Sequence, residues 1–142
     1  MIVRFDIERD LLAGVIDVAD IPAAWDAAMK DLLGIDTTGN YRDGCMQDVH
    51  WFAGLIGYFP CYTLGAVAAA QLYAGLKRAQ PGIEVHIRKG DFAPLRAWLR
   101  REVHGQGRLL DGLEVVTQAT GRALDTRDYL QHLLHRYGGA AA

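Results

Sequence analysis

The sequence predicts an all-α protein, a multi-helix region interrupted by one long glycine-rich loop. Apolar residues recur at helical spacing through most of the 142 residues, and glycine or proline marks the ends of these stretches. No clean alternation of apolar and polar residues, typical of a strand, occurs. With 51% hydrophobic and 23% charged residues, we expect a single helical domain over residues 1–142.

Two helices are expected before the loop. Apolar residues at i, i+4 and i+8 from Val3 predict a helix that stops before Gly14. The next begins near Asp20, whose carboxylate can accept an N–H of the first turn, and it ends at Gly34. We expect its buried stripe to comprise Trp25, Met29, Leu32 and Leu33.

Residues 34–59 break this periodicity. They contain five glycines and several aromatic residues before Pro60, and we expect this segment to be mostly irregular. A loop of this length inside a compact domain is more often functional than not.

Helices dominate the remainder of the chain. The 60–79 stretch is rich in alanine and glycine, which predicts a central helix that packs close to its neighbours. A short helical piece ends at Gly90, and Asp91 caps a helix with the core stripe Phe92, Leu95, Trp98, Leu99 and Val103.

Two further helices are expected at the end, over 111–120 and from Asp125. In the last one Asp128 completes an acidic version of the capping box. Its expected buried residues are Tyr129, Leu130, Leu133, Leu134 and Tyr137.

Charge and hydropathy argue against several partners. The formal net charge of -2 gives no electrostatic reason to expect nucleic acid or an anionic membrane surface. The most apolar stretch, 58–76, is interrupted by two glycines and a proline, so no membrane span is expected. Cys45 and Cys61 are the only cysteines, and no signal peptide is visible at Met1, so we expect reduced thiols and a cytoplasmic location.

Generic catalytic and metal motifs are absent from the sequence. It contains no His-Glu-x-x-His, no Cys-x-x-Cys and no phosphate-binding glycine loop. His132 and His135 lie at i, i+3 and could share a metal, but surface histidines on an amphipathic helix are the stronger interpretation. His86 and His104 are expected to be isolated, exposed polar residues.

The most informative stretch runs from Gly44 to Gly65. It concentrates Gln47, Asp48, His50 and two tyrosines, Tyr58 and Tyr62, in a segment that leads into a helix N-terminus. Such a segment can bind a carboxylate or an oxyanion. The structural alternative is a loop pinned by its aromatic residues, with Asp48 as a local cap and His50 as a hydrogen-bonded core residue.

This stretch also carries a resemblance. Gly44-x-x-Gln47-Asp48-x-His50-Trp51 matches the G-x-x-Q-D-x-H-W signature of the carboxypeptidase Taq family. The segment 57–65 is similar to the family's Gly-Tyr-Phe-Pro-Thr-Tyr-x-Leu-Gly, with Cys61 in place of the usual threonine, and 3–8 is similar to its Arg-Phe-Glu-Ile-Glu helix. The resemblance covers essentially the whole chain.

The resemblance implies a mostly helical, homodimeric zinc enzyme that removes C-terminal residues from peptides. The family's His-Glu-x-x-His motif, its downstream glutamate ligand and a substrate-binding arginine motif belong upstream of the matched region. We therefore expect this chain to be the C-terminal part of such an enzyme, without zinc ligands of its own and inactive alone. Zinc is the expected cofactor of the complete enzyme.

By resemblance, site roles fall on six residues. His50 is the expected catalytic residue and, with Tyr58 and Tyr62, binds the peptide substrate, although a packing role for the two tyrosines is equally expected. Gln47, Asp48 and Trp51 are expected to hold the loop and His50 in place; no residue here is expected to bind metal. We also expect self-association through apolar surface on the 60–79 helix and its preceding loop, or through the N-terminal helix. The alternative function is a non-catalytic helical interaction module that retains the fold.

Overall fold

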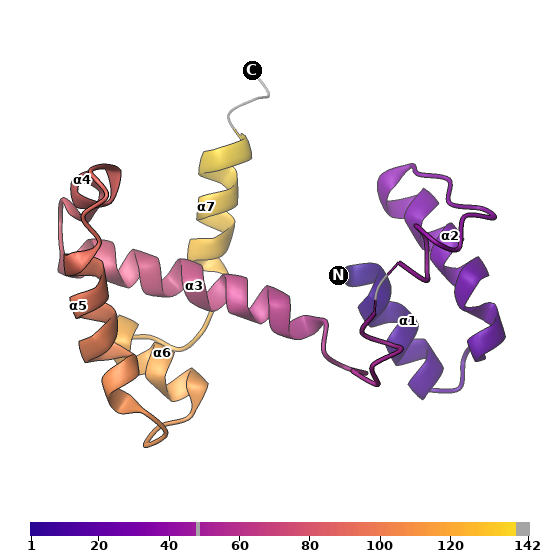
Figure 1. The fold of residues 1–142 in the computed structure, drawn as a ribbon, viewed down its shortest axis with the longest axis horizontal. Coiled ribbons are helices and arrows are strands. Elements are labelled where there is room, and N and C mark those ends of the chain that lie inside the picture. Colours follow the sequence, from indigo (N-terminus) through magenta and orange to yellow (C-terminus); the bar gives the residue numbers. More distant parts are fainter. Residues whose placement is uncertain (48, 139–142) are drawn as a thin grey trace. The chain divides into compact units, whose positions relative to one another are not determined.

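The computed structural model describes all residues except Asp48 and 139–142. The described residues form helices joined by turns, with no strand among them, so the all-α prediction is confirmed (Figure 1). The α-helices are α1 (Ile2–Leu12), α2 (Ile21–Leu33), α3 (Pro60–Ala79), α4 (Ile83–Arg88), α5 (Ala93–Glu102), α6 (Gly112–Thr120) and α7 (Arg127–Tyr137). Short 3-10 turns, η1 (Val18–Asp20) and η2 (His104–Gln106), precede α2 and follow α5.

The chain divides into two compact units, Met1–Thr63 and Leu64–Ala142. The first turn of α3 counts with the first unit and the rest of this helix with the second. The single domain expected from the sequence remains a prediction.

In the first unit, α1 and α2 enclose a small core. Its buried residues are Val3, Ile7, Trp25 and Cys45, and the partly buried Trp51 packs against them. The expected end of α2 is confirmed, because Gly34 has φ +68°, a left-handed conformation that glycine adopts without steric cost.

Two details of α2 were predicted wrongly. The Asp20 carboxylate caps no N–H of α2; its Oδ2 instead accepts the Asp17 N–H at 2.9 Å, because the 3-10 turn before the helix brings those groups together. Leu32 and Leu33 are exposed rather than buried, since no described segment covers the last turn of α2 on that side.

Residues 34–59 hold turns and bends, and no helix or strand occurs in the part of this segment that the structure describes. The segment is anchored at its end by Phe59, whose side chain is 1% exposed. Because Phe59 is buried, it fixes the position of the backbone where the loop ends and α3 begins.

In the second unit, α3 packs close to its neighbours as predicted. Gly75 lies against α6, where an added Cβ would come 3.2 Å from the Thr120 methyl group. Leu76, Ile83 and Trp98 form the buried core between α3, α4 and α5. The stripe predicted for α5 is confirmed except at Phe92, which is exposed because it precedes the helix at its N-cap.

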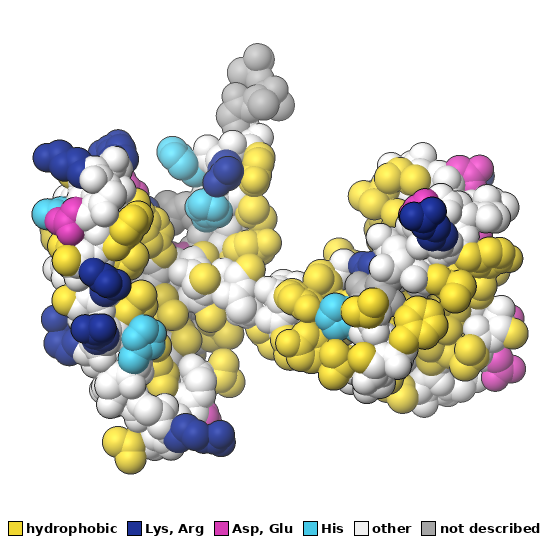
Figure 2. Space-filling view, in the orientation of Figure 1, with side chains coloured by type: hydrophobic (Ala, Val, Ile, Leu, Met, Phe, Trp, Pro, Cys, Tyr) yellow, Lys and Arg dark blue, Asp and Glu magenta, His cyan; other side chains and the backbone are white. Residues whose placement is uncertain are grey.

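The last helix differs most from expectation. No residue of α7 is buried, and Leu130, Leu134 and Tyr137 are exposed, because no described segment packs on that side. Figure 2 shows hydrophobic side chains along one side of this helix. The predicted capping box does not form: the Asp125 carboxylate accepts the Arg127 N–H at 2.8 Å, and Asp128 pairs with Arg122.

The described residues include no helix that is both long enough and apolar enough to cross a membrane.

Candidate functional site

The structure brings three of the predicted site residues together in the first unit. His50 Nε2 lies 2.8 Å from the Tyr62 hydroxyl, within hydrogen-bond distance. The Tyr58 ring centroid lies 5.5 Å from the rings of both His50 and Tyr62. Tyr58 and Tyr62 are exposed and His50 is half-buried, so the three polar groups form a cluster that solvent can reach.

The buried side chain of Phe59 packs against this cluster. The Phe59 ring centroid is 5.0 Å from the His50 ring and 6.2 Å from the Trp51 ring, which meets it edge-on. The Arg4 guanidinium carbon lies 5.2 Å from the centroid of the Phe59 ring. Phe59 therefore links the cluster to α1, and its burial restricts where the His50 ring can lie.

The backbone around His50 is tightly turned. The His50 carbonyl accepts hydrogen bonds from the N–H groups of Ala53 at 3.1 Å and Leu55 at 2.9 Å. Gly54 and Gly57 have positive φ, at +72° and +76°, where a side chain would be strained. These turns let the chain reverse between His50 and Tyr58, which places both residues beside the first turn of α3.

The His50–Tyr62 hydrogen bond has two possible directions, which depend on the histidine tautomer. If the His50 Nε2–H donates to the tyrosine oxygen, the Tyr62 O–H can donate outward to an anion. If Tyr62 donates to His50, the tyrosine oxygen can only accept from outside. The pair can thus present a hydroxyl donor to a carboxylate or to a developing oxyanion.

The helix N-terminus contributes less than the sequence predicts. In the first turn of α3, the Cys61 N–H donates to the Tyr58 carbonyl at 3.0 Å and the Tyr62 N–H to the Phe59 carbonyl at 3.2 Å. These two N–H groups are therefore already used by the local turn, so anion binding at this site depends mainly on side chains.

The three residues expected to support His50 have different outcomes. Trp51 is partly buried and fixed by a hydrogen bond from its indole N–H. Gln47 is exposed, and the hydrogen bond it makes runs from its backbone N–H to the Gly44 carbonyl at 3.3 Å. Asp48 lies outside the described residues. The roles of these residues toward His50 remain predictions.

Sequence reasoning missed the residue that accepts the Trp51 hydrogen bond. Glu8 of α1 is 2% exposed, and its Oε1 lies 2.9 Å from Trp51 Nε1. One feature of the sequence could have indicated a role for Glu8. It is a charged residue beside the apolar stripe of α1, within the stretch that resembles the family's Arg-Phe-Glu-Ile-Glu helix.

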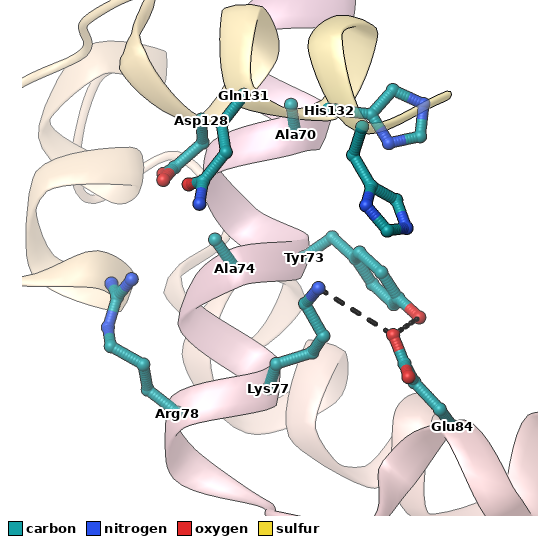
Figure 3. A pocket seen from close by; sticks show the side chains of 10 residues that line it. Ala70, Tyr73, Ala74, Lys77, Arg78, Glu84, Asp128, Gln131 and His132 are labelled. Atoms are coloured by element: carbon teal, nitrogen blue, oxygen red, sulfur yellow. Dashed lines mark hydrogen bonds and ion pairs between the residues drawn. The ribbon is translucent and has the colours of Figure 1, made fainter. Parts of the chain in front are cut away.

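A pocket of about 610 Å³ lies in the second unit between α3, α4 and α7 (Figure 3). His132 and His135 both line it, beside Lys77, Glu84 and Tyr73. Lys77 Nζ is 3.6 Å from Glu84 Oε1, and the Tyr73 hydroxyl donates to the same oxygen at 3.4 Å. Burial, reinforced by Glu84, raises the pKa of the Tyr73 phenol, so this group stays protonated as a donor. Charges of both signs lie here, which selects no single class of ligand.

The residues that the structure describes contain no preformed group of zinc ligands. A zinc site needs three or four converging nitrogen, oxygen or sulfur ligands. Within the described part of the chain, no group of three or more His, Cys, Asp or Glu side chains could hold a metal, and His132 and His135 have no third ligand there.

The remaining histidines lie apart from the His50 cluster in sequence and differ from each other. His104 begins the 3-10 turn after α5 and is exposed. His86 is exposed but not isolated, which corrects the prediction: its Nδ1 lies 2.9 Å from the Asp91 carboxylate, because α4 and α5 meet at a tight turn.

Comparisons with known proteins agree with the motif. A model of the carboxypeptidase Taq (M32) metallopeptidase family matches residues 1–137. Thermostable carboxypeptidase 1 of Pyrococcus furiosus is 36% identical over 137 residues, which cover 96% of this chain and 27% of that protein. Carboxypeptidase 1 of Bacillus subtilis is 35% identical with the same coverage. The chain thus spans about a quarter of the length of these curated relatives.

Solved structures give the same result. Metallocarboxypeptidase 1 of Trypanosoma cruzi matches with a TM-score of 0.89 at 42% identity, over 96% of this chain and 29% of that one. The M32 carboxypeptidase of Deinococcus radiodurans R1 matches with a TM-score of 0.90 at 42% identity, over 97% of this chain and 28% of that one.

Proposed function

Because this chain belongs to the carboxypeptidase Taq (M32) metallopeptidase family, we propose that it supplies substrate-facing residues of a peptide-cleaving carboxypeptidase. Zinc, in this proposal, is held by the part of the family fold that the chain does not span. When bound there, the metal supplies a Lewis acid and an activated water.

One observation carries the proposal: His50, Tyr58 and Tyr62 form an accessible cluster in which His50 and Tyr62 are hydrogen-bonded at 2.8 Å. A carboxypeptidase must bind the terminal carboxylate of its substrate and stabilise the oxyanion that forms at the scissile carbonyl. A tyrosine hydroxyl held by a histidine is a suitable donor for either task. His50 is the proposed catalytic residue, and Tyr62 and Tyr58 are the proposed substrate-binding residues.

A chimaera tests this function. Residues 1–137 of this chain would replace the matching 137 residues of the Pyrococcus furiosus relative. We expect the chimaera to bind zinc and to release C-terminal residues from peptides in a chelator-sensitive way. A folded chimaera that binds zinc but cleaves no peptide would refute the proposal.

The chain alone is the matched control. We expect it to bind no stoichiometric zinc and to release no amino acids from peptides, with or without added zinc, because the ligands would lie elsewhere. If the purified chain released amino acids from peptides in a chelator-sensitive way, and His50→Ala abolished that release, the chain would be an enzyme by itself. The proposal that zinc is held outside this chain would then be wrong.

We also propose that the chain self-associates. The support is the apolar side of α7, where Leu130, Leu134 and Tyr137 are exposed at i, i+4 and i+7. Exposed apolar surface of this kind tends to find a partner. The same observation favours the alternative function, a helical interaction module without catalysis.

The cytoplasm remains our proposed location. Cys45 and Cys61 are both free thiols, and Cys61 is exposed. An exposed free thiol persists most readily in a reducing compartment.

A further inference from the structure

Glu8 is a buried carboxylate far in sequence from the loop it touches. It lies on α1 with 2% of its surface exposed, among the residues that form the core of the first unit. Burial of a charged side chain is unfavourable unless hydrogen bonds or opposite charges compensate it. A carboxylate in this position therefore needs specific hydrogen-bond partners.

The two carboxylate oxygens have one such partner each. Oε1 accepts the Trp51 indole N–H at 2.9 Å, and Oε2 accepts the Gly57 backbone N–H at 3.1 Å. These donors stand 43 and 49 residues away along the chain. Trp51 directly follows His50, and Gly57 directly precedes Tyr58. A single side chain thus holds the two ends of the 51–57 segment.

The chemistry of this contact selects a carboxylate. Both partners are N–H donors, so the central group must accept on both atoms. Glutamine offers one acceptor oxygen and one NH₂ donor, and its NH₂ would face an N–H group at one of the two ends. No rotation of the amide satisfies both donors at once.

We propose that Glu8 is a positioning residue that fixes the His50–Tyr62 pair by clamping both ends of the 51–57 segment. The clamp itself stands on the two hydrogen bonds; its consequence for peptide cleavage rests on the proposed function. Glu8 would not touch the substrate. It would act through Trp51 and Gly57 on the residues beside them.

Nuclear magnetic resonance of the full chain tests the clamp directly. In the Glu8→Gln variant, we expect the Gly57 backbone amide to exchange its hydrogen about tenfold faster. The reason is that glutamine offers one acceptor oxygen in place of the two carboxylate oxygens of Glu8. The Trp51 indole N–H and the carbon-bound ring protons of His50 should shift as well. The matched control is Asp6→Asn, the same change at an exposed carboxylate on α1, which should leave all three signals in place.

A second variant separates the clamp from a general loss of stability. Trp51→Phe removes one of the two donors, so the amide oxygen of the substituted glutamine could turn toward Gly57. The Glu8→Gln change should therefore cost the Gly57 amide little protection in the Trp51→Phe background. Equal losses in both backgrounds, or His50 signals that do not move in folded Glu8→Gln, would overturn the proposal.

The chimaera links the clamp to catalysis. There Glu8→Gln should lower kcat/KM about tenfold with zinc content unchanged, and Asp6→Asn should change neither. Unchanged kinetics would limit Glu8 to a structural role and overturn its positioning role. If the unmodified chimaera were inactive, the proposed function would fail, while the resonance measurements would still decide whether the clamp exists.

Discussion

At the scale of single residues, His50 and Tyr62 form the chemically distinctive pair. Their separation of twelve residues did not by itself predict a contact, because an irregular loop can lead in any direction. The motif resemblance named both residues, whereas the 2.8 Å approach depends on the turns after His50 and on the buried Phe59. Glu8 could not be assigned a role from sequence, because its partners lie 43 and 49 residues away.

Tyr62→Phe should separate chemistry from stability. Tyr62 is an exposed residue, so loss of its hydroxyl should change the free energy of unfolding of the chain by less than about 1 kcal/mol. In the chimaera the same change should lower kcat about a hundredfold if the hydroxyl donates to the oxyanion. Chemical denaturation and steady-state kinetics measure the two effects; a large stability loss with unchanged kcat would point to a packing role.

The two cysteines should react at different rates. Burial raises the pKa of the Cys45 thiol, so its reactive thiolate is scarce at neutral pH, and its side chain is buried. Cys61 is exposed. We expect iodoacetamide to add one group quickly and the second only slowly, as read by intact mass. Simultaneous modification of both thiols in the folded chain would contradict this packing of Cys45.

At the scale of elements, helical periodicity and glycine stops predicted where the helices lie, but not which apolar faces are covered. Leu33 and Leu134 fit a buried stripe by spacing, yet both are exposed. Periodicity identifies residues that share a face; whether another segment packs on that face depends on tertiary structure. Close packing of α3 was predictable, because its small residues leave room for a neighbour, as at Gly75.

Two glycines of α3 should respond in opposite ways to substitution. Gly75→Leu would force a side chain against Thr120 and should destabilise the second unit by about 1–3 kcal/mol. An added Cβ at Gly65 meets nothing within 4 Å, so Gly65→Ala should stabilise by about 0.5–1 kcal/mol. Thermal denaturation of both variants checks the pair; similar effects would contradict the packing of α3 on α6.

Gln71 joins α3 to the segment between α6 and α7. Its side chain is 0% exposed; its Nε2 donates to Thr120 Oγ1 at 2.9 Å and to the Arg122 carbonyl at 3.1 Å, and its Oε1 accepts the Asp125 N–H at 3.0 Å. Gln71→Leu would leave the Asp125 N–H without its acceptor and remove a donor from Thr120 and Arg122, so it should cost about 3 kcal/mol. A loss below about 1 kcal/mol in chemical denaturation would show that water replaces the amide.

Stability of the second unit should fall in acid. The hydrogen bond with His86 lowers the pKa of Asp91 below its ordinary value of 3.8, and the Arg127 N–H does the same for Asp125. A lowered pKa means that the unfolded chain binds protons first, so the stabilisation is present above pH ~4 and is lost as the pH falls further. Asp91→Asn should weaken this dependence in denaturation curves between about pH 5 and 2; an unchanged slope would contradict the Asp91–His86 contact.

At the scale of the whole molecule, the chain corresponds to about a quarter of its curated relatives, 27% of their length. Three apolar side chains along α7 are exposed in the structure. Sequence alone could indicate the family, but not which surfaces would be left uncovered.

Self-association should depend on α7. We expect light scattering at high concentration to give a mass above that of one chain, and Leu134→Lys to lower it, because a charge would interrupt the apolar side of the helix. The control is Leu109→Lys, a charge introduced at another exposed leucine, outside α7. A clean monomer, or equal effects of both variants, would contradict the assignment of α7 as the contact.

The central claim is that His50 acts on the substrate while the metal is held elsewhere. Steady-state kinetics of the His50→Ala chimaera, combined with its zinc content, test this claim most directly. We predict that kcat/KM falls about 10²–10³-fold while the chimaera keeps its full complement of zinc. Activity close to that of the unmodified chimaera, or loss of zinc along with activity, would contradict the account.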